Sequence, residues 1–120
     1  MKPHIDSTEF GRITIDGEKY EYDIFITLNG EIKKRDKKLS KSVYGTSHKL
    51  SKDEAKYIFE KGADFLVIGS GQDGVLEISD EALLYFEKKG VKVELKTTPE
   101  AINIYNNSSG AVIGLFHITC

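Results

Sequence analysis

Three glycines in the segment FLVIGSGQDG, residues 65–74, have the spacing G-x-G-x-x-G. This spacing is found in the turn that binds the pyrophosphate of a dinucleotide, where a helix begins directly at the glycines. Here the next helix is expected to begin at Ser79, after the strand-like segment 75–78, and Glu94, the acidic residue 20 positions after Gly74, lies inside a predicted strand. We therefore reject a dinucleotide site and expect no bound cofactor.

The same glycine loop could still bind a smaller group. A loop at the carboxyl end of a parallel strand exposes backbone amides, and such loops bind anions and small ligands. The alternative is local: Gly69 and Gly71 allow a sharp turn, and Asp73-Gly74 is a common turn pair. We favour the turn, because isolated glycine motifs often occur without a ligand.

A second group of polar residues, GTSH at 45–48, stands directly ahead of a helix that we expect to begin at Ser51. Donors near a helix N-terminus can bind an anion, so this segment and the glycine loop could line one pocket. The alternative, which we favour, is that they only hold the start of the helix through local hydrogen bonds. The pocket requires the two loops to converge in space. Its candidate ligand-binding residues are Thr46, Ser47, His48, Gly69, Ser70, Gly71 and Gln72.

His117 and Cys120 could support nucleophilic chemistry, but they lie three positions apart in a predicted strand. That spacing puts their side chains on opposite faces, which argues against a Cys–His pair. We expect Cys120 to pack rather than to serve as a redox or modification site, because no electropositive setting is visible around it. The histidines and Cys120 also lack the spacing of metal ligands. We predict no metal and no catalytic residues, and we lean away from an enzyme.

A basic run, KKRDKKLSK at 33–41, is interrupted only by Asp36. It could contact phosphates or an acidic partner. The alternative is a solvated edge strand or loop, where lysines discourage pairing with another chain. We favour the solvated edge, since no aromatic residue is interleaved in the run. The run is nevertheless the segment where we would look first for a protein partner.

The first third of the chain must supply strands. Tyr20, Tyr22 and Ile24 alternate with charged residues, which is the pattern of a half-buried strand. Asp16-Gly17 and Asn29-Gly30 are typical of hairpin turns, because these pairs tolerate positive φ. We predict an antiparallel meander over roughly residues 4–35.

The remainder alternates helices with strands. Ser51, Ser79 and Thr98 are expected helix N-caps, and the first of them forms a capping box with Glu54. Strands joined through helices run parallel. The fold class is therefore α/β: a three-layer α/β/α-type sandwich with a parallel core sheet and an N-terminal antiparallel β-meander. The expected core strands are 64–69, 91–95 and 111–118.

Composition limits the classes of function. At 120 residues, 39% hydrophobic and 30% charged, the chain is expected to form one domain, 1–120. Its formal net charge of −2 gives no reason to expect nucleic acid as a partner. No apolar run is long enough for a membrane span. The lone Cys120 fits a reducing compartment, and we expect the cytoplasm.

Several motifs together resemble a known family. They are YGTSHKLSKDEA (44–55), VIGSGQDGVLEIS (67–79), TTPEAINIYN (97–106) with FHITC (116–120), and the opening HIDSTEFGRITIDGEKYEYDI. The chain resembles the adipogenesis-associated domain family, which has a mitochondrial relative that is an assembly factor for respiratory complex I. The resemblance covers essentially the whole chain and implies a three-layer α/β sandwich. It carries over no catalytic residues.

Two hypotheses of function follow. The first, which the resemblance favours, is a non-catalytic assembly or regulatory module that binds a protein partner. The second is a small-ligand protein or enzyme that binds an anion or phosphorylated metabolite with the 44–48 and 69–74 loops.

Overall fold

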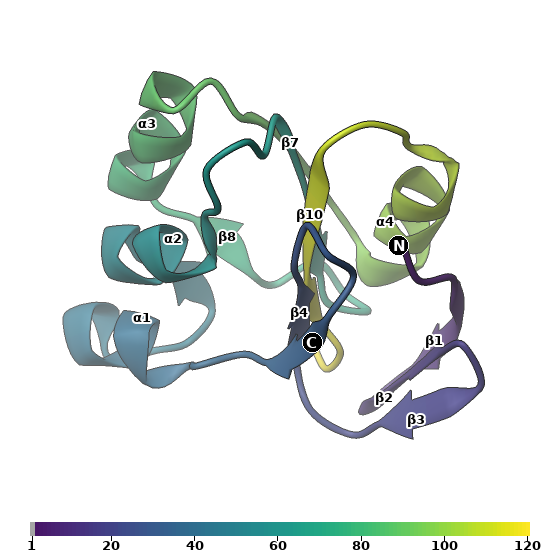
Figure 1. Cartoon of the computed structure of the whole chain (residues 1–120). Helices are drawn as coiled ribbons and strands as arrows, with labels where there is room; N and C mark the ends of the chain where they lie inside the picture. Colours follow the sequence, from purple (N-terminus) through teal and green to yellow (C-terminus); the bar gives the residue numbers. More distant parts are fainter. Residues whose placement is uncertain (1) are drawn as a thin grey trace.

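A computed structural model describes residues 2–120 and shows a mixed α/β fold in three layers (Figure 1). A five-stranded sheet forms the middle layer. One face is covered by helices α1, α2 and α3, at the left of Figure 1, and the other by helix α4 with a small N-terminal sheet. This arrangement confirms the predicted layers. No helix among the described residues is long and apolar enough to cross a bilayer.

The small N-terminal sheet is the first part of the predicted meander. Strands β1 (Ile5–Glu9), β2 (Arg12–Ile15) and β3 (Glu18–Tyr20) pair antiparallel in that order. The turn between β2 and β3 is Asp16-Gly17, and both residues have positive φ, 49° and 82°. The chain then bends at 21–23 and leaves this sheet, so the expected long strand is two strands in two sheets.

The central sheet has the order β5-β4-β10-β7-β9. Its parallel part contains β10, β7 and β9, and β4 and β5 extend it as an antiparallel hairpin closed by Asn29-Gly30. The strands are β4 (Ile24–Ile26), β5 (Ile32–Lys34), β7 (Phe65–Ser70), β9 (Lys92–Lys96) and β10 (Val112–His117). The predicted core strands are confirmed to within one or two residues.

Within residues 2–120, four helices cover the central sheet. They are α1 (Lys38–Tyr44), α2 (Lys52–Ile58), α3 (Asp80–Lys88) and α4 (Thr98–Asn107). Ser51 and Ser79 cap α2 and α3 as expected, each accepting a backbone N–H three residues on. Helix α4 begins one residue early: Thr97 is the N-cap, and Thr98 bonds elsewhere. Helix α1 is not among the predicted elements, because the basic run at 33–41 favours an edge strand or loop.

Two apolar clusters lie on opposite faces of the central sheet. Leu66 and Ile68 face the cluster under α2 and α3, whereas Val67 between them faces the cluster under α4 and the N-terminal sheet. Both faces of β7 are therefore buried, which explains its continuous apolar sequence. A two-stranded parallel pair, β6 (Lys49–Leu50) and β8 (Glu77–Ile78), ties the chain before α2 to the chain before α3.

Candidate functional site

The two loops that could line one pocket, the alternative not favoured from sequence, both approach His117 near the ends of β7 and β10. The His48 ring lies edge-on to the His117 ring, with centroids 5.3 Å apart. On the glycine loop, a Cβ added at Gly71 would lie 2.8 Å from Cδ2 of His117. His117 is fully buried between them.

The glycine loop, however, uses its amides within the chain. Gln72 N–H donates to the Thr119 carbonyl (2.7 Å), and both Asp73 and Val75 N–H donate to the Cys120 oxygen (3.1 Å each). Gly71 N–H donates to Thr98 Oγ1 (2.9 Å). The loop therefore binds residues 119 and 120, which follow β10, and the side chain of Thr98. Gly71 and Gly74 have the positive φ of a turn, whereas Gly69, which the sequence interpretation also placed in the turn, lies inside β7.

The side chains of this loop are engaged as well. Ser70 Oγ donates to the Lys96 carbonyl (2.9 Å), and Gln72 Nε2 donates to Thr8 Oγ1 (3.1 Å). At Gly69 a Cβ would meet Thr98 Oγ1 at 2.9 Å, so this glycine permits close packing of α4 on the sheet. These contacts account for the residues at 69–72 without a ligand.

The segment GTSH also makes local contacts. Thr46 Oγ1 accepts the His48 N–H (3.1 Å), and the His48 carbonyl accepts the Glu77 N–H (2.8 Å). The Ser47 carbonyl accepts a bond from Arg35 Nη2 (2.7 Å). The contact with Arg35 is the one that sequence could not anticipate, because Arg35 belongs to the basic run predicted to be solvated.

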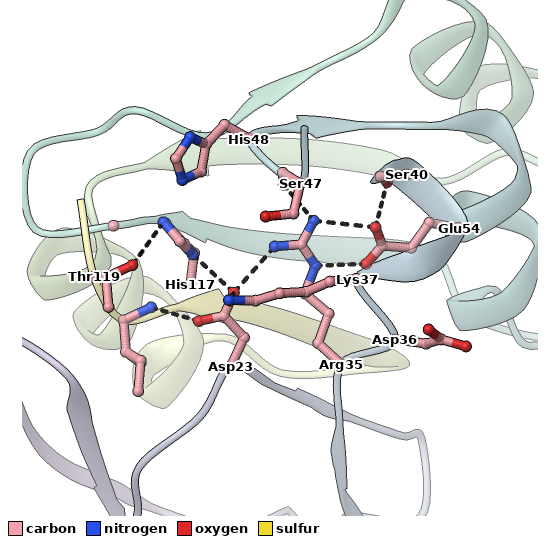
Figure 2. Close-up of polar contacts among 12 residues, drawn as sticks. Asp23, Arg35, Asp36, Lys37, Ser40, Ser47, His48, Glu54, His117 and Thr119 are labelled. Atoms are coloured by element: carbon pink, nitrogen blue, oxygen red, sulfur yellow. Dashed lines mark hydrogen bonds and ion pairs between the residues drawn. The ribbon is translucent and has the colours of Figure 1, made fainter. Parts of the chain in front are cut away.

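Arg35 is the centre of a buried ionic network (Figure 2). Its guanidinium donates to Glu54 through Nε (2.7 Å) and Nη2 (3.1 Å) and to Asp23 Oδ2 through Nη1 (3.0 Å). All three side chains are at most 1% exposed. The expectation of a solvated basic run is wrong at this position, because Arg35 turns inward where β5 ends.

Ser40, Ser51 and His117 complete the network. Ser40 on α1 donates to Glu54, while Ser51 Oγ accepts the Glu54 N–H (3.0 Å). Half of the predicted capping box is thus present, but the Glu54 carboxylate points to Arg35 instead of back to the Ser51 amide. At the other end, His117 Nδ1 lies 2.7 Å from Asp23 Oδ2.

Asp23 and Arg35 are both held in their ionised forms. Burial by itself would raise the pKa of Asp23, but its hydrogen bond to His117, the His117 charge and the Ile118 N–H outweigh burial and lower the pKa to about 2. Burial would lower the pKa of Arg35, and the bond and charge of Glu54 outweigh it and raise that pKa. Asp23 is therefore a carboxylate at neutral pH.

A cleft of about 610 Å³ is lined by Asp23 and Arg35 of this network. Lys37 also lines it, and Lys37 Nζ lies 3.7 Å from Asp23 Oδ2 (Figure 2). Three lysines of the basic run line the cleft, and no local pattern in the sequence connects them with residues near 23 and 119. The lining residues are Glu21, Tyr22, Asp23, Lys34, Arg35, Asp36, Lys37, Lys38, Ile118 and Thr119.

Nothing local in the sequence marks the residues of this network as a site. Asp23 stands in an alternating strand pattern, Arg35 in a basic run and Glu54 in a helix cap, and each of these local patterns has an ordinary explanation. Their common signal is tertiary, since Asp23 precedes β4, Arg35 follows β5 and Glu54 belongs to α2. Among the described residues, no group of three His, Cys, Asp or Glu side chains is placed to hold a metal ion.

Known proteins are similar to this chain in sequence and in fold. The sequence profile of a family described as "Protein of unknown function (DUF498/DUF598)" matches residues 5–112. The conserved hypothetical protein PH1505 from Pyrococcus horikoshii OT3 is 33% identical over 100% of both chains, with a TM-score of 0.91. A solved structure named MT938 is 30% identical over 99% of this chain and 100% of that chain, with a TM-score of 0.82.

A more distant structure shares the fold alone. A Bordetella pertussis protein, described as a Mth938-like domain, is 14% identical to this chain. The match covers 96% of this chain and 85% of that one, with a TM-score of 0.62.

Proposed function

This chain belongs to the protein family of unknown function DUF498/DUF598, and we propose that it binds a small ligand bearing a carboxylate or phosphate group in the cleft lined by Lys34, Lys37 and Lys38. The observation that carries the proposal is the cleft itself, with its lysine rim over the buried ionic network. Its volume of about 610 Å³ falls within the range of about 300–1,000 Å³ that is usual for small-molecule sites.

The charges of the cleft favour an anion. Four basic and three acidic side chains line it, whereas the whole chain has a net charge of −2. At the floor, Arg35 is shared between Asp23 and Glu54, and Lys37 Nζ lies 3.7 Å from Asp23 Oδ2. Lys34, Lys37 and Lys38 are exposed at the rim, and ammonium groups bind carboxylate and phosphate oxygens.

The cleft also offers an apolar contact. Tyr22 is 42% exposed, and its ring stacks under Lys34 Nζ at 5.3 Å. Ile118 is also among the lining residues, although it is almost fully buried. A ligand with an apolar body and an anionic end would satisfy both kinds of surface.

The test is thermal unfolding of the purified protein with inorganic phosphate, phosphorylated metabolites and aromatic carboxylates. At 100 times its dissociation constant, a ligand should stabilise the protein by about 2.7 kcal/mol. The double variant Lys37→Gln, Lys38→Gln should lose that effect. Lys33→Gln is the matched control, because Lys33 lies next to Lys34 but lines a different, smaller hollow. Equal shifts in all variants, or no shift with any compound, would reject the proposal.

A second candidate is the assembly or regulatory module suggested by the resemblance to the adipogenesis-associated family. The observation that favours it is the run of exposed lysines on β5, an edge strand, and on the start of α1. Charge reversal must avoid the buried Arg35, so the variant is Lys33→Glu, Lys34→Glu. A specific partner retained by the wild type should be lost by this variant. A partner retained equally by both would place the contact elsewhere.

A further inference from the structure

A carboxylate, an imidazole and a hydroxyl follow one another from the network to the cleft. Asp23 Oδ2 lies 2.7 Å from His117 Nδ1, and His117 Nε2 lies 3.3 Å from Thr119 Oγ1 (Figure 2). Asp23 and His117 are buried, whereas Thr119 is partly exposed and lines the cleft. The order of groups is that of an orienting acid, a base and a nucleophile.

The direction of the hydrogen bonds follows from the charge on Asp23. Because this carboxylate is ionised, it accepts, and Nδ1 of His117 must carry the proton between them. A protonated ring would donate from Nε2 to Thr119 Oγ1, whereas in the neutral form Nε2 has a free lone pair and accepts the bond from the Thr119 hydroxyl. In that neutral form, Nε2 is the base that faces the hydroxyl proton.

The imidazole has little freedom to turn away. The His48 ring packs against the His117 ring in a T-shaped arrangement, and a Cβ at Gly71 would lie 2.8 Å from Cδ2 of His117. Asp23 itself is fixed by Arg35 and by the Ile118 N–H, which donates to Oδ1 (3.0 Å). The titratable or charged groups around His117 include Asp23 and His48, and Arg35 and Lys37 lie against the same Asp23 oxygen that His117 contacts.

We propose that Thr119 Oγ1 accepts an acyl group from an activated carboxylic ester in the cleft, with His117 as general base and Asp23 as a positioning residue. Oγ1 forms a bond to the acyl carbon as its proton passes to His117 Nε2. The bond from that carbon to the leaving oxygen breaks with its electron pair, and the leaving oxygen takes the proton from Nε2. Water then releases the acyl group by the same steps in reverse.

Lys37 is placed to assist the step. Its ammonium lies 3.7 Å from Asp23 Oδ2 and lines the same cleft as Thr119. A positive charge beside the cleft stabilises the oxyanion that forms when a carbonyl is attacked. This role rests on the proposed function, because it requires that a ligand enter the cleft.

The experiment is acylation of the whole chain by p-nitrophenyl acetate, followed by release of nitrophenolate and by peptide mapping. We expect an acetyl group on Thr119, with nitrophenolate release falling about 100-fold in Thr119→Val. Thr119→Ser keeps the hydroxyl and should retain the activity. Asp23→Asn, where it folds, should shift the pH profile of acylation, which a merely structural role would leave in place.

Acetylation of lysines alone, or equal rates in wild type and Thr119→Val, would overturn the inference. p-Nitrophenyl acetate carries no anionic group, so this result is separate from the anion-binding test. Failure here with anion binding intact would reject the nucleophile and keep the binding site. Failure of anion binding with acylation intact would reject the lysine rim and keep the nucleophile.

Discussion

At the scale of single residues, the buried ionic network is the feature that most needs a physical account. Two carboxylates share one guanidinium with almost no exposure to water. Desolvation of such groups costs several kcal/mol for each ion, and the attraction between them compensates only if the remaining hydrogen bonds are made. Here they are made, by Ser40 to Glu54 and by the Ile118 N–H to Asp23.

Arg35→Met should destabilise the protein by about 3–5 kcal/mol, because it leaves two buried carboxylates without their partner. Urea unfolding followed by circular dichroism measures this effect. Lys33→Met, two residues earlier and exposed, is the control and should change the free energy of unfolding by less than about 0.5 kcal/mol. Similar small effects in both variants would mean that Arg35 does not compensate the buried carboxylates of Asp23 and Glu54.

Asp23 should make stability depend on pH at the acid end. Its pKa in the folded protein, about 2, lies below its ordinary value of 3.8, so its contribution is present above pH 4 and is lost as the pH falls toward 2. The contribution is about 2 kcal/mol. Urea unfolding of wild type and Asp23→Asn should show their difference narrowing by this amount over that range.

The control for this titration is Glu21→Gln, which removes an exposed acid two residues away. Its stability should run parallel to that of the wild type at every pH. A constant difference between wild type and Asp23→Asn from pH 5 to pH 2 would contradict the role of Asp23.

At the scale of elements, the end of β10 is held by the loop after β7. The two strands pair in parallel up to His117 and Ser70, and the loop then binds the following main chain. Gly71 is central, because its φ is 104° and a Cβ there would collide with the Cys120 carbonyl group. The glycine spacing therefore serves close approach of two backbones within the chain.

Gly71→Ala should lower stability well beyond the cost of positive φ alone. Gly90→Ala is the matched control, since Gly90 has φ 74° and open space around its Cβ position. We expect about 1–2 kcal/mol for Gly90→Ala and a clearly larger loss for Gly71→Ala, both measured by urea unfolding. Equal losses would show that the residues after β10 move aside freely when a Cβ is added at Gly71.

At the scale of the whole molecule, the two apolar clusters share one sheet. A substitution in either cluster changes the packing of strands that also carry the other, so we expect the chain to unfold as one cooperative unit. This is the remaining test of the single-domain expectation.

Phe86→Ala and Ile13→Ala test this coupling, because Phe86 belongs to the cluster under α2 and α3 and Ile13 to the other. Each should cost about 2–5 kcal/mol and shift the same transition. Circular dichroism and tyrosine fluorescence should give coincident curves for both variants. Two separated transitions would indicate that the clusters unfold independently.

Much of the fold is predictable because its signals are local. The caps Ser51 and Ser79, the Asp16-Gly17 turn and the alternation along β2 depend only on neighbours in sequence. Helix α1 escapes prediction because its sequence is basic and polar, with no clear apolar stripe. The resemblance to a family correctly implied the layered α/β architecture, and the sequence profile places the chain in DUF498/DUF598.

The sequence by itself predicted the core strands of the parallel sheet, the antiparallel strands of the first third and, within residues 2–120, three of the four helices, because hydrogen-bonding and periodicity rules act over a few residues. Only the tertiary structure decided that Asp23, Arg35, Glu54 and His117 meet, since they are contributed by separate segments of the chain. A charged residue is expected to be exposed to solvent, unless ion-pair partners from other parts of the chain surround it in the folded protein. The site was hidden in the sequence because its partners are adjacent only after the sheet has formed.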